Sequence, residues 1–276
     1  MMINSIFNRM LLVGFVTLFF SIALKIAAKE DASLVLYFSF DAVSGKEVKD
    51  ESGKGNNGKV VGNPKFVDGR FGKALQMTGE SDHVEVAHSD SLIFQEGITY
   101  MACSQIEKWN GEGDQWIDKG AHSAKGTGCG IMVHAAANFY FMLGDGAARQ
   151  DLTFPAAGKV PMGKEWHHIA ATFDGTKLSL YADGAHRGSL PARVTFQEGG
   201  SARIGKAAWD AGTNYFNGLI DEFRVLNYAQ DWQTILRQYR KGWGAQYSTD
   251  AGNRWSAVPE SALSFAGAIQ GNPGPF

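Results

Sequence analysis

Two runs of apolar, aromatic and β-branched residues lie on either side of an Asp-Gly pair in the middle of the chain. The runs cover residues 166–173 and 178–182, and Asp174-Gly175 lies between them. Asp-Gly between such runs is a strong signal for a β-hairpin. A second pair, Asp183-Gly184, follows, and closely spaced turns of this kind are typical of antiparallel all-β domains. The pattern therefore predicts an all-β fold.

The alternation along this hairpin also predicts which side chains face the core. A two-residue turn at Asp174-Gly175 would place Phe173 opposite Thr176, Ala171 opposite Leu178, and Ile169 opposite Leu180. Successive residues of a strand point to opposite faces, so the face that carries Ile169 and Leu180 is mostly apolar and forms the core.

The opposite face of the hairpin carries aromatic and hydrogen-bonding side chains, namely Trp166, His168 and Tyr181. An aromatic ring with polar neighbours on an open sheet can stack against a sugar ring. We therefore predict that these three residues bind a ligand. The alternative is that they pack under a neighbouring loop or against a sheet partner.

A single segment has a convincing helical pattern. In residues 229–240, the apolar side chains at positions i, i+3, i+4 and i+7 fall on one face, and they are Trp232, Ile235, Leu236 and Tyr239. Gly242 follows as a stop signal. We predict a short C-terminal helix whose apolar face packs on the sheets, followed by a flexible tail over residues 243–276, where no periodicity is found.

The N-terminus has the pattern of an export signal. Arg9 precedes an apolar run over residues 10–24, and the small residues Ala27-Ala28 follow. This order is typical of a signal peptide over residues 1–28. The run is shorter than the roughly 20 residues of a membrane span, which favours cleavage over an uncleaved anchor. We expect the protein to be secreted, periplasmic or on the cell surface, with no membrane span after signal removal.

Composition excludes several classes of function. The formal net charge is −2, and no stretch holds a Lys/Arg cluster of the kind that binds phosphates or anionic lipid, so a nucleic-acid partner is not expected. The sequence contains no G-x-S-x-G elbow, H-E-x-x-H motif or phosphate-binding loop. The chain has 34 glycines among its 276 residues, which is above the usual share of roughly 7%. This excess fits a chain with many turns.

Five motifs, in this order, carry a resemblance to a known family; they occupy residues 36–41, 50–58, 69–77, 165–184 and 217–225. They resemble those of the laminin-G-like jelly-roll domains of the concanavalin A-like lectin/glucanase superfamily. The resemblance implies a two-sheet antiparallel jelly-roll sandwich over residues 29–242. It also implies a non-catalytic module that binds carbohydrate or an extracellular protein surface. Cys103 stands where the family usually has Trp.

Oxygen-bearing side chains in the turns suggest a hard cation. Calcium binds six to eight oxygens from carboxylates, amides and carbonyls, and members of the resembled family often hold such a structural ion. The candidate ligands are Asp41, Asn57, Asp82 and Asp221. The alternative is that these residues form turns and cap backbone groups.

A glycoside hydrolase is the competing interpretation. Some laminarinase-like relatives use E-x-D-x-x-E on one strand, and Glu80, Asp82 and Glu85 have that spacing. Retaining chemistry needs two carboxyl groups about 5–5.5 Å apart. The segment begins Thr78-Gly79, however, which is typical of a turn, so we predict no enzymatic activity.

The chain contains two cysteines, Cys103 and Cys129. An oxidising compartment permits a disulfide between them, but the geometry of the fold decides whether it can form. The alternative is that both are buried thiols that act as small apolar side chains.

Overall fold

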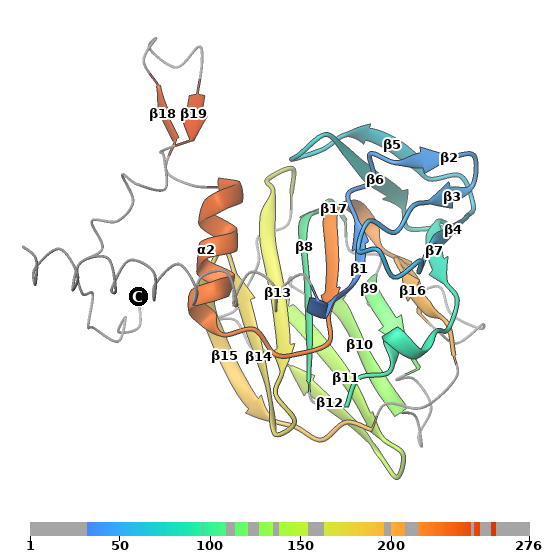
Figure 1. Ribbon diagram of the computed structural model, residues 1–276, viewed down its shortest axis with the longest axis vertical. Helices are drawn as coiled ribbons and strands as arrows, with labels where there is room; N and C mark the ends of the chain where they lie inside the picture. Colours follow the sequence, from blue (N-terminus) through green and yellow to red (C-terminus); the bar gives the residue numbers. More distant parts are fainter. Residues whose placement is uncertain are drawn as a thin grey trace, which may run out of the picture.

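The alternating segments of the sequence form two large antiparallel sheets stacked face to face (Figure 1). The computed structural model describes residues 32–95, 97–108, 114–120, 127–134, 138–153, 163–195, 200–207, 215–243, 246–248 and 255–257. The predicted all-β jelly-roll sandwich with a short helix is therefore confirmed. The predicted signal peptide and most of the predicted tail lie outside the described residues, and both remain predictions.

The first sheet, sheet A, has β15 at one edge and β5 at the other. In spatial order its strands are β15 (Ala185–Pro191), β14 (Lys177–Ala182), β13 (His167–Phe173), β8 (Ile98–Ile106), β17 (Asn217–Leu226), β6 (Lys73–Thr78) and β5 (Lys65–Asp68), and β1 (Leu34–Phe38) also pairs with β17.

The second sheet, sheet B, lies behind sheet A in Figure 1. Its strands are, in spatial order, β12 (Arg149–Thr153), β11 (Asn138–Asp145), β10 (Thr127–His134), β9 (Asp114–Lys119), β16 (Ala202–Ile204), β7 (His83–Val86), β4 (Gly58–Val61), β3 (Glu47–Val48) and β2 (Val43–Ser44). The 3-10 turn η1 (Asp90–Leu92) follows β7, and the hairpin of β18 (Gln246–Ser248) and β19 (Trp255–Ala257) lies beyond the helix.

The main hydrophobic core fills the space between the two sheets. Trp116 on β9 is fully buried, and its ring lies 5.9 Å from that of Phe223 on β17 and 6.5 Å from that of Phe139 on β11. The tryptophan thus joins sheet B to the closing strand of sheet A. Edge-to-face contacts of this kind stabilise aromatic clusters beyond their buried area.

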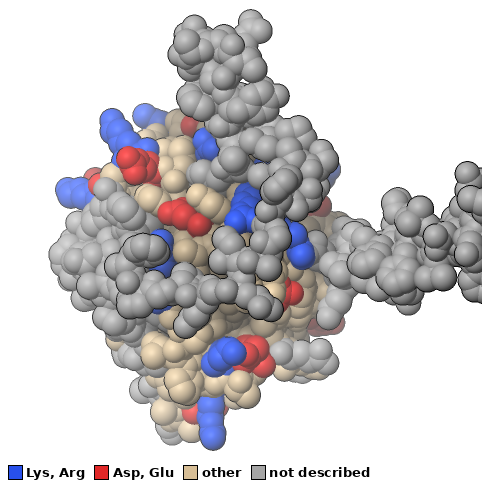
Figure 2. All heavy atoms as spheres, turned by 90° about the vertical axis from the view of Figure 1, so that its left-hand side faces the viewer, with Lys and Arg blue, Asp and Glu red and all other residues tan. Residues whose placement is uncertain are grey.

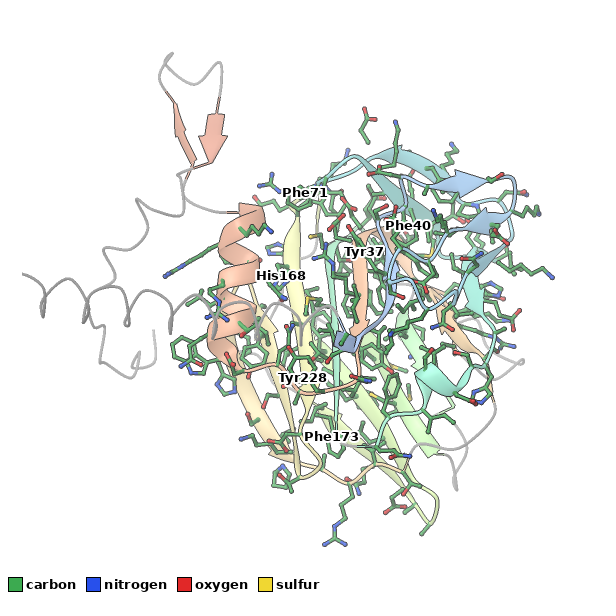
Figure 3. All side chains as sticks on the ribbon, viewed as in Figure 1. Tyr37, Phe40, Phe71, His168, Phe173 and Tyr228 are labelled. Atoms are coloured by element: carbon green, nitrogen blue, oxygen red, sulfur yellow. The ribbon has the colours of Figure 1, made fainter. Side chains whose placement is uncertain are left out.

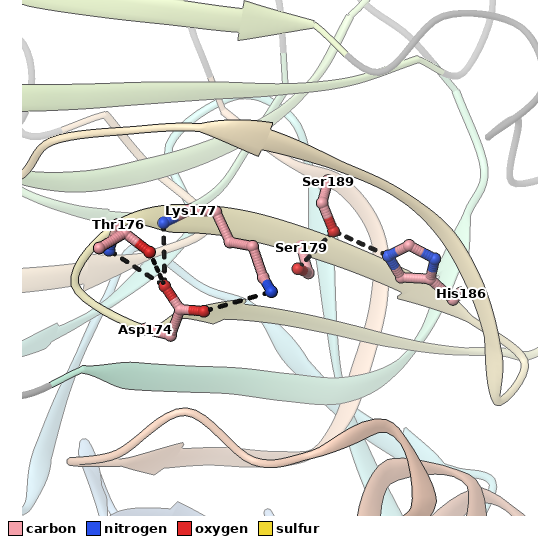
Figure 4. Close-up of polar contacts among 6 residues, drawn as sticks. All are labelled: Asp174, Thr176, Lys177, Ser179, His186 and Ser189. Carbon is pink, nitrogen blue, oxygen red and sulfur yellow. Dashed lines mark hydrogen bonds and ion pairs between the residues drawn. The ribbon is translucent and has the colours of Figure 1, made fainter.

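The β13–β14 hairpin has the predicted faces but not the predicted register. Phe173 pairs with Leu178 and Ala171 with Leu180. The predicted register was therefore wrong by two residues along β14. Asp174 instead pairs with Lys177, because its backbone N–H donates to the Lys177 carbonyl at 3.2 Å. Its Oδ1 also accepts hydrogen bonds from the backbone N–H groups of Thr176 and Lys177 (Figure 4). Gly175, with φ 91°, begins the turn. An even shift preserves the face of every side chain.

Helix α2 (Trp232–Trp243) packs against the outer face of sheet A, over β13, β14 and β15 (Figure 1). It begins after Asp231, whose Oδ1 accepts a hydrogen bond from the backbone N–H of Thr234 at 2.7 Å, as an N-cap residue does. Ile235 is fully buried, but Trp232 is 52% exposed, so part of the predicted apolar face points to solvent. No helix among the described residues is long and apolar enough to cross a membrane.

Candidate functional site

The closing strand β17 contains a bulge that gathers polar side chains on the outer face of sheet A. Its pairing with β8 shifts between Asp221 and Arg224, and Glu222 has φ 54°. Ile220 and Phe223 on either side both point into the core. The extra residue therefore leaves Asp221 and Glu222 together on the outer face, which is the usual effect of a β-bulge. A non-glycine residue with positive φ is uncommon and often marks a functional position.

Glu222 is held by two partners on this face. The hydroxyl of Tyr37 on β1 donates to Glu222 Oε1 at 2.9 Å, and Arg224 donates to Glu222 Oε2. The Arg224 guanidinium also lies over the Tyr37 ring, 4.4 Å from its centre, in a cation–π contact. Burial raises the pKa of Tyr37 to about 12, so the phenol stays protonated and remains a donor.

Asp221 and Asp41 both bind the loop between β5 and β6. Asp221 Oδ2 accepts a hydrogen bond from the backbone N–H of Phe71 at 2.8 Å, and Asp41 Oδ1 accepts one from that of Lys73 at 2.6 Å. A side chain at Gly69 would collide with Asp221 Oδ2, and one at Gly72 would collide with Asp41. The structure therefore brings these two predicted metal ligands to one loop. We call Tyr37, Asp41, Asp221, Glu222 and Arg224 the β17 cluster.

Asp221 is the most perturbed acid of the β17 cluster. It is fully buried, and its Oδ1 has no partner that meets hydrogen-bond geometry among the described residues. Burial, the largest effect, raises the pKa of its carboxyl to about 7, and the nearby charge of Glu222 adds to the increase. A buried oxygen of this kind is suited to a proton or a cation.

The other two predicted metal ligands, Asp82 and Asn57, accept hydrogen bonds that stabilise other loops. Asp82 is buried and accepts hydrogen bonds from Asn63 N–H at 2.8 Å and from the Thr78 hydroxyl at 3.0 Å. Asn57 Oδ1 accepts from the Asp50 N–H at 2.9 Å. No cluster of three or more acidic, His or Cys side chains that could hold a metal is found among the described residues. Asn57 and Asp82 thus have local hydrogen-bond partners of their own, and their role as metal ligands remains a prediction.

The predicted ligand face is covered by α2. Tyr181 and Ile235 belong to one buried cluster, and the His168 ring lies 6.1 Å from that of Tyr239 on the helix. His168 and Tyr181 are each only 6% exposed. Trp166, just before β13, is half-buried. The expectation that this face is open is therefore not met, and a role for these three residues in ligand binding remains a prediction.

His168 lies in a cross-strand row with Cys103 on β8 and Asp221 on β17, and Figure 3 shows it beside α2. A row of Cys, His and Asp is typical of thiol catalysis. Burial, however, raises the pKa of the Cys103 thiol well above its usual range and lowers that of His168 to about 4. The thiol therefore stays protonated, and the row lacks a reactive thiolate.

Replacement of His168 by Gln should change the pH dependence of stability. The folded-state pKa of about 4 lies below the unfolded value of 6.5. Between these values the unfolded chain binds more protons, so stability present above pH 6.5 is lost as the pH falls toward 4. The loss due to this residue should be on the order of 3 kcal/mol. Urea melts of both proteins from pH 7 to 4 test this; parallel curves would contradict it.

The two cysteines cannot meet in this fold. Cys129 on β10 faces the core between the sheets, whereas the β8 residues that face this core are the neighbours of Cys103 rather than Cys103 itself. Both thiols are free and buried. The alternative of two buried thiols is therefore the one that the structure supports.

The three carboxylates of the hydrolase interpretation do not converge on one point. Glu80 is exposed in the turn after β6, and both oxygens of Asp82 bind the backbone or Thr78. Glu85 on β7 accepts from the Ser201 hydroxyl at 3.1 Å and lies 3.7 Å from Arg203 Nε. Asp82 and Glu85 are thus held by different neighbours, and Glu80 points to solvent in its turn.

The sequence reasoning missed Tyr37, Glu222 and Arg224. Their signal is a break in the alternation of the closing strand, where Ile220-Asp221-Glu222-Phe223 has two polar residues between two apolar ones. Such a break predicts a bulge, because only an extra residue keeps Ile220 and Phe223 on the same face.

The comparisons with known proteins agree with this geometry. Two antiparallel sheets stacked over one hydrophobic core place the chain in the class of jelly-roll sandwich domains. The chain belongs to the concanavalin A-like lectin/glucanases superfamily, whose family model matches residues 78–236. A comparison with curated proteins finds no match.

Several solved structures share the fold at low sequence identity. The binding domain of Paraclostridial Mosquitocidal Protein 1 is 18% identical with a TM-score of 0.63, over 80% of this chain and 57% of that one. Domain 4 of the arabinanase AbnA from Geobacillus stearothermophilus, solved with arabinotriose, is 21% identical with a TM-score of 0.59. The match covers 74% of this chain and 97% of that one. The binding domain of botulinum neurotoxin DC, solved with rat synaptotagmin II, is 16% identical with a TM-score of 0.60, over 77% and 52%. This chain thus spans little more than half of the first and third of these structures, and both of those are binding domains.

Proposed function

We propose that this protein is an exported, non-catalytic module that binds carbohydrate. The observation that carries the proposal is the fold shared with binding domains, in a chain whose candidate carboxylates Asp82 and Glu85 are held by separate local partners while Glu80 is exposed. A neighbour solved with arabinotriose supports a saccharide as ligand. Export rests on the charged, apolar and small-residue order of residues 1–28.

A protein surface is the second candidate ligand. The binding domain of botulinum neurotoxin DC was solved with rat synaptotagmin II, so this fold also supports protein recognition in another chain. Folds of this kind host many functions. The choice between the two ligands therefore depends on a binding measurement.

A glycan array probed with the secreted form, in calcium and in chelator, tests the proposed function. We expect retention on at least one class of saccharide. An array without any retained saccharide, together with capture of the protein by an immobilised extracellular protein, would replace the carbohydrate proposal by the second candidate.

We also propose that Asp41 and Asp221 hold a structural calcium ion beside the loop of residues 69–72. Both carboxylates contact this loop, and the buried Asp221 Oδ1 is left for a further partner. Two carboxylates are fewer than the six to eight oxygens that calcium takes, so backbone carbonyls and water would complete the site. The ion would neutralise buried charge and fix the loop against β17.

Calcium should therefore stabilise the folded protein. Binding to the folded state alone adds about 2.7 kcal/mol at a free concentration of 100 times Kd, and the melting temperature should rise accordingly. Asp221→Asn should abolish the rise. Asp68→Asn is a matched control, since Asp68 is exposed near the same loop and its ion-pair partner among the described residues is Lys73. Equal melting temperatures in calcium and in chelator would refute the proposed site.

A further inference from the structure

Helix α2 has one face packed on sheet A and one face open to solvent. Ile235 is fully buried, and Leu236 and Tyr239 lie against Gly184 at the turn between β14 and β15. On the open side, Trp232 is 52% exposed and is the only large exposed apolar side chain among the described residues. An exposed tryptophan on a rigid helix provides a flat ring surface for a ligand.

The open side of α2 is positively charged, although the whole chain has a net charge of −2. Arg237, Arg240 and Lys241 are exposed, and the helix contains no acidic residue. Figure 2 faces this side of the molecule and shows a group of blue Lys and Arg side chains near its centre. Arg240 follows Trp232 by eight residues, which is about 12 Å along a helix.

The edge strand β15 adds hydrogen-bonding groups beside α2. It leaves Gly184 toward the end of the molecule at which α2 begins (Figure 1). On it, exposed Ser189 is within 2.7 Å of the Ser179 hydroxyl and 2.9 Å of His186 Nε2 (Figure 4). This network holds an exposed hydroxyl and an exposed imidazole in fixed positions.

We propose that the open side of α2, together with His186 and Ser189 of β15, binds an anionic polysaccharide. Trp232 stacks on a sugar ring, Arg237, Arg240 and Lys241 pair with its acidic groups, and His186 and Ser189 contact its hydroxyls. The inference rests on the proposed carbohydrate function and names the class of ligand. Positive charge beside an aromatic ring complements a carboxylated or sulfated sugar.

An anionic membrane is a poorer match for this surface. A helix that lies in a membrane buries a broad apolar face in the lipid. The apolar face of α2, with Ile235, is instead packed on sheet A, and among the helix side chains that the structure describes Trp232 is the one large apolar residue that is exposed. The surface therefore suits a polar polymer with flat sugar rings.

The test measures the affinity for polygalacturonate and for its fully methyl-esterified, neutral form by isothermal titration at two salt concentrations. We expect tighter binding of the acidic form, weakened by salt because ions screen exposed charges. Trp232→Ala and the triple variant Arg237→Gln/Arg240→Gln/Lys241→Gln should each weaken binding by about tenfold, which equals about 1.4 kcal/mol. The control Lys49→Gln/Lys54→Gln/Lys59→Gln removes the same charge from exposed positions before and within β4, and it should bind as the unmodified protein does.

The outcomes separate this inference from the function on which it rests. Equal binding of both polymers, unchanged in the α2 variants, would keep the carbohydrate function and overturn the α2 surface. If the protein binds neither polymer and no glycan on the array, both the carbohydrate function and the α2 surface are overturned. Binding to vesicles of anionic phospholipid but not to polygalacturonate would replace the polysaccharide by a membrane. Circular dichroism of each variant confirms that α2 is still folded.

Discussion

Replacement of Trp116 by Ala should destabilise the protein more than any other single change considered, by about 3–5 kcal/mol. The side chain is fully buried and contacts Phe139 in sheet B and Phe223 in sheet A. Its loss leaves a cavity that touches both sheets, and a close-packed core relaxes only partly around such a cavity. Equilibrium unfolding in urea measures the change.

Trp232→Ala is the matched control for this experiment. It removes the same side chain from a position that is 52% exposed, so the free energy of unfolding should change by no more than about 0.5 kcal/mol. Equal losses at Trp116 and Trp232 would mean that the core does not join the two sheets through β9 and β17.

Leu180→Ala should cost about 2–5 kcal/mol. Leu180 is fully buried between Ala171 and Gly188 in sheet A and belongs to the core between the sheets. Tyr181, on the opposite face, packs with Ile235 of α2, so Tyr181→Ala should cost a similar amount. Lys177→Ala, at an exposed position of the same strand, should be nearly neutral.

The comparison of these three variants tests whether α2 covers sheet A. If Tyr181→Ala proves neutral while Leu180→Ala is severe, the face of Tyr181 is open, and the original expectation of a ligand face on β13 and β14 is correct. Comparable losses at both positions mean that both faces of the hairpin are closed.

The alternation of the sequence was sufficient to predict the sandwich and the core face of the hairpin. It was not sufficient for the register, because the turn is closed by hydrogen bonds from Thr176 and Lys177 to the Asp174 side chain, which alternation does not reveal. Likewise, the helical pattern located α2 within three residues, but it did not show that Trp232 would point outward.

The candidate site was only partly predictable, for a physical reason. Asp41 and Asp221 lie far apart in sequence and both reach the segment of residues 69–73, because β1 and β6 both pair with β17. Asp82 and Asn57 are similar residues in similar turns, yet they bind local backbone groups instead. Only the strand pairing shows which of these side chains reach the same loop.

The most direct test of the binding-module account measures binding and hydrolysis in the same tube. The secreted form is incubated with insoluble laminarin, lichenan, agarose or xylan; the protein in the pellet and the reducing ends in the supernatant are then quantified. The account predicts that protein sediments with at least one glycan and that no reducing ends are released. Release of reducing ends that is abolished by Glu80→Gln or Glu85→Gln would contradict it and would identify the protein as a glycoside hydrolase.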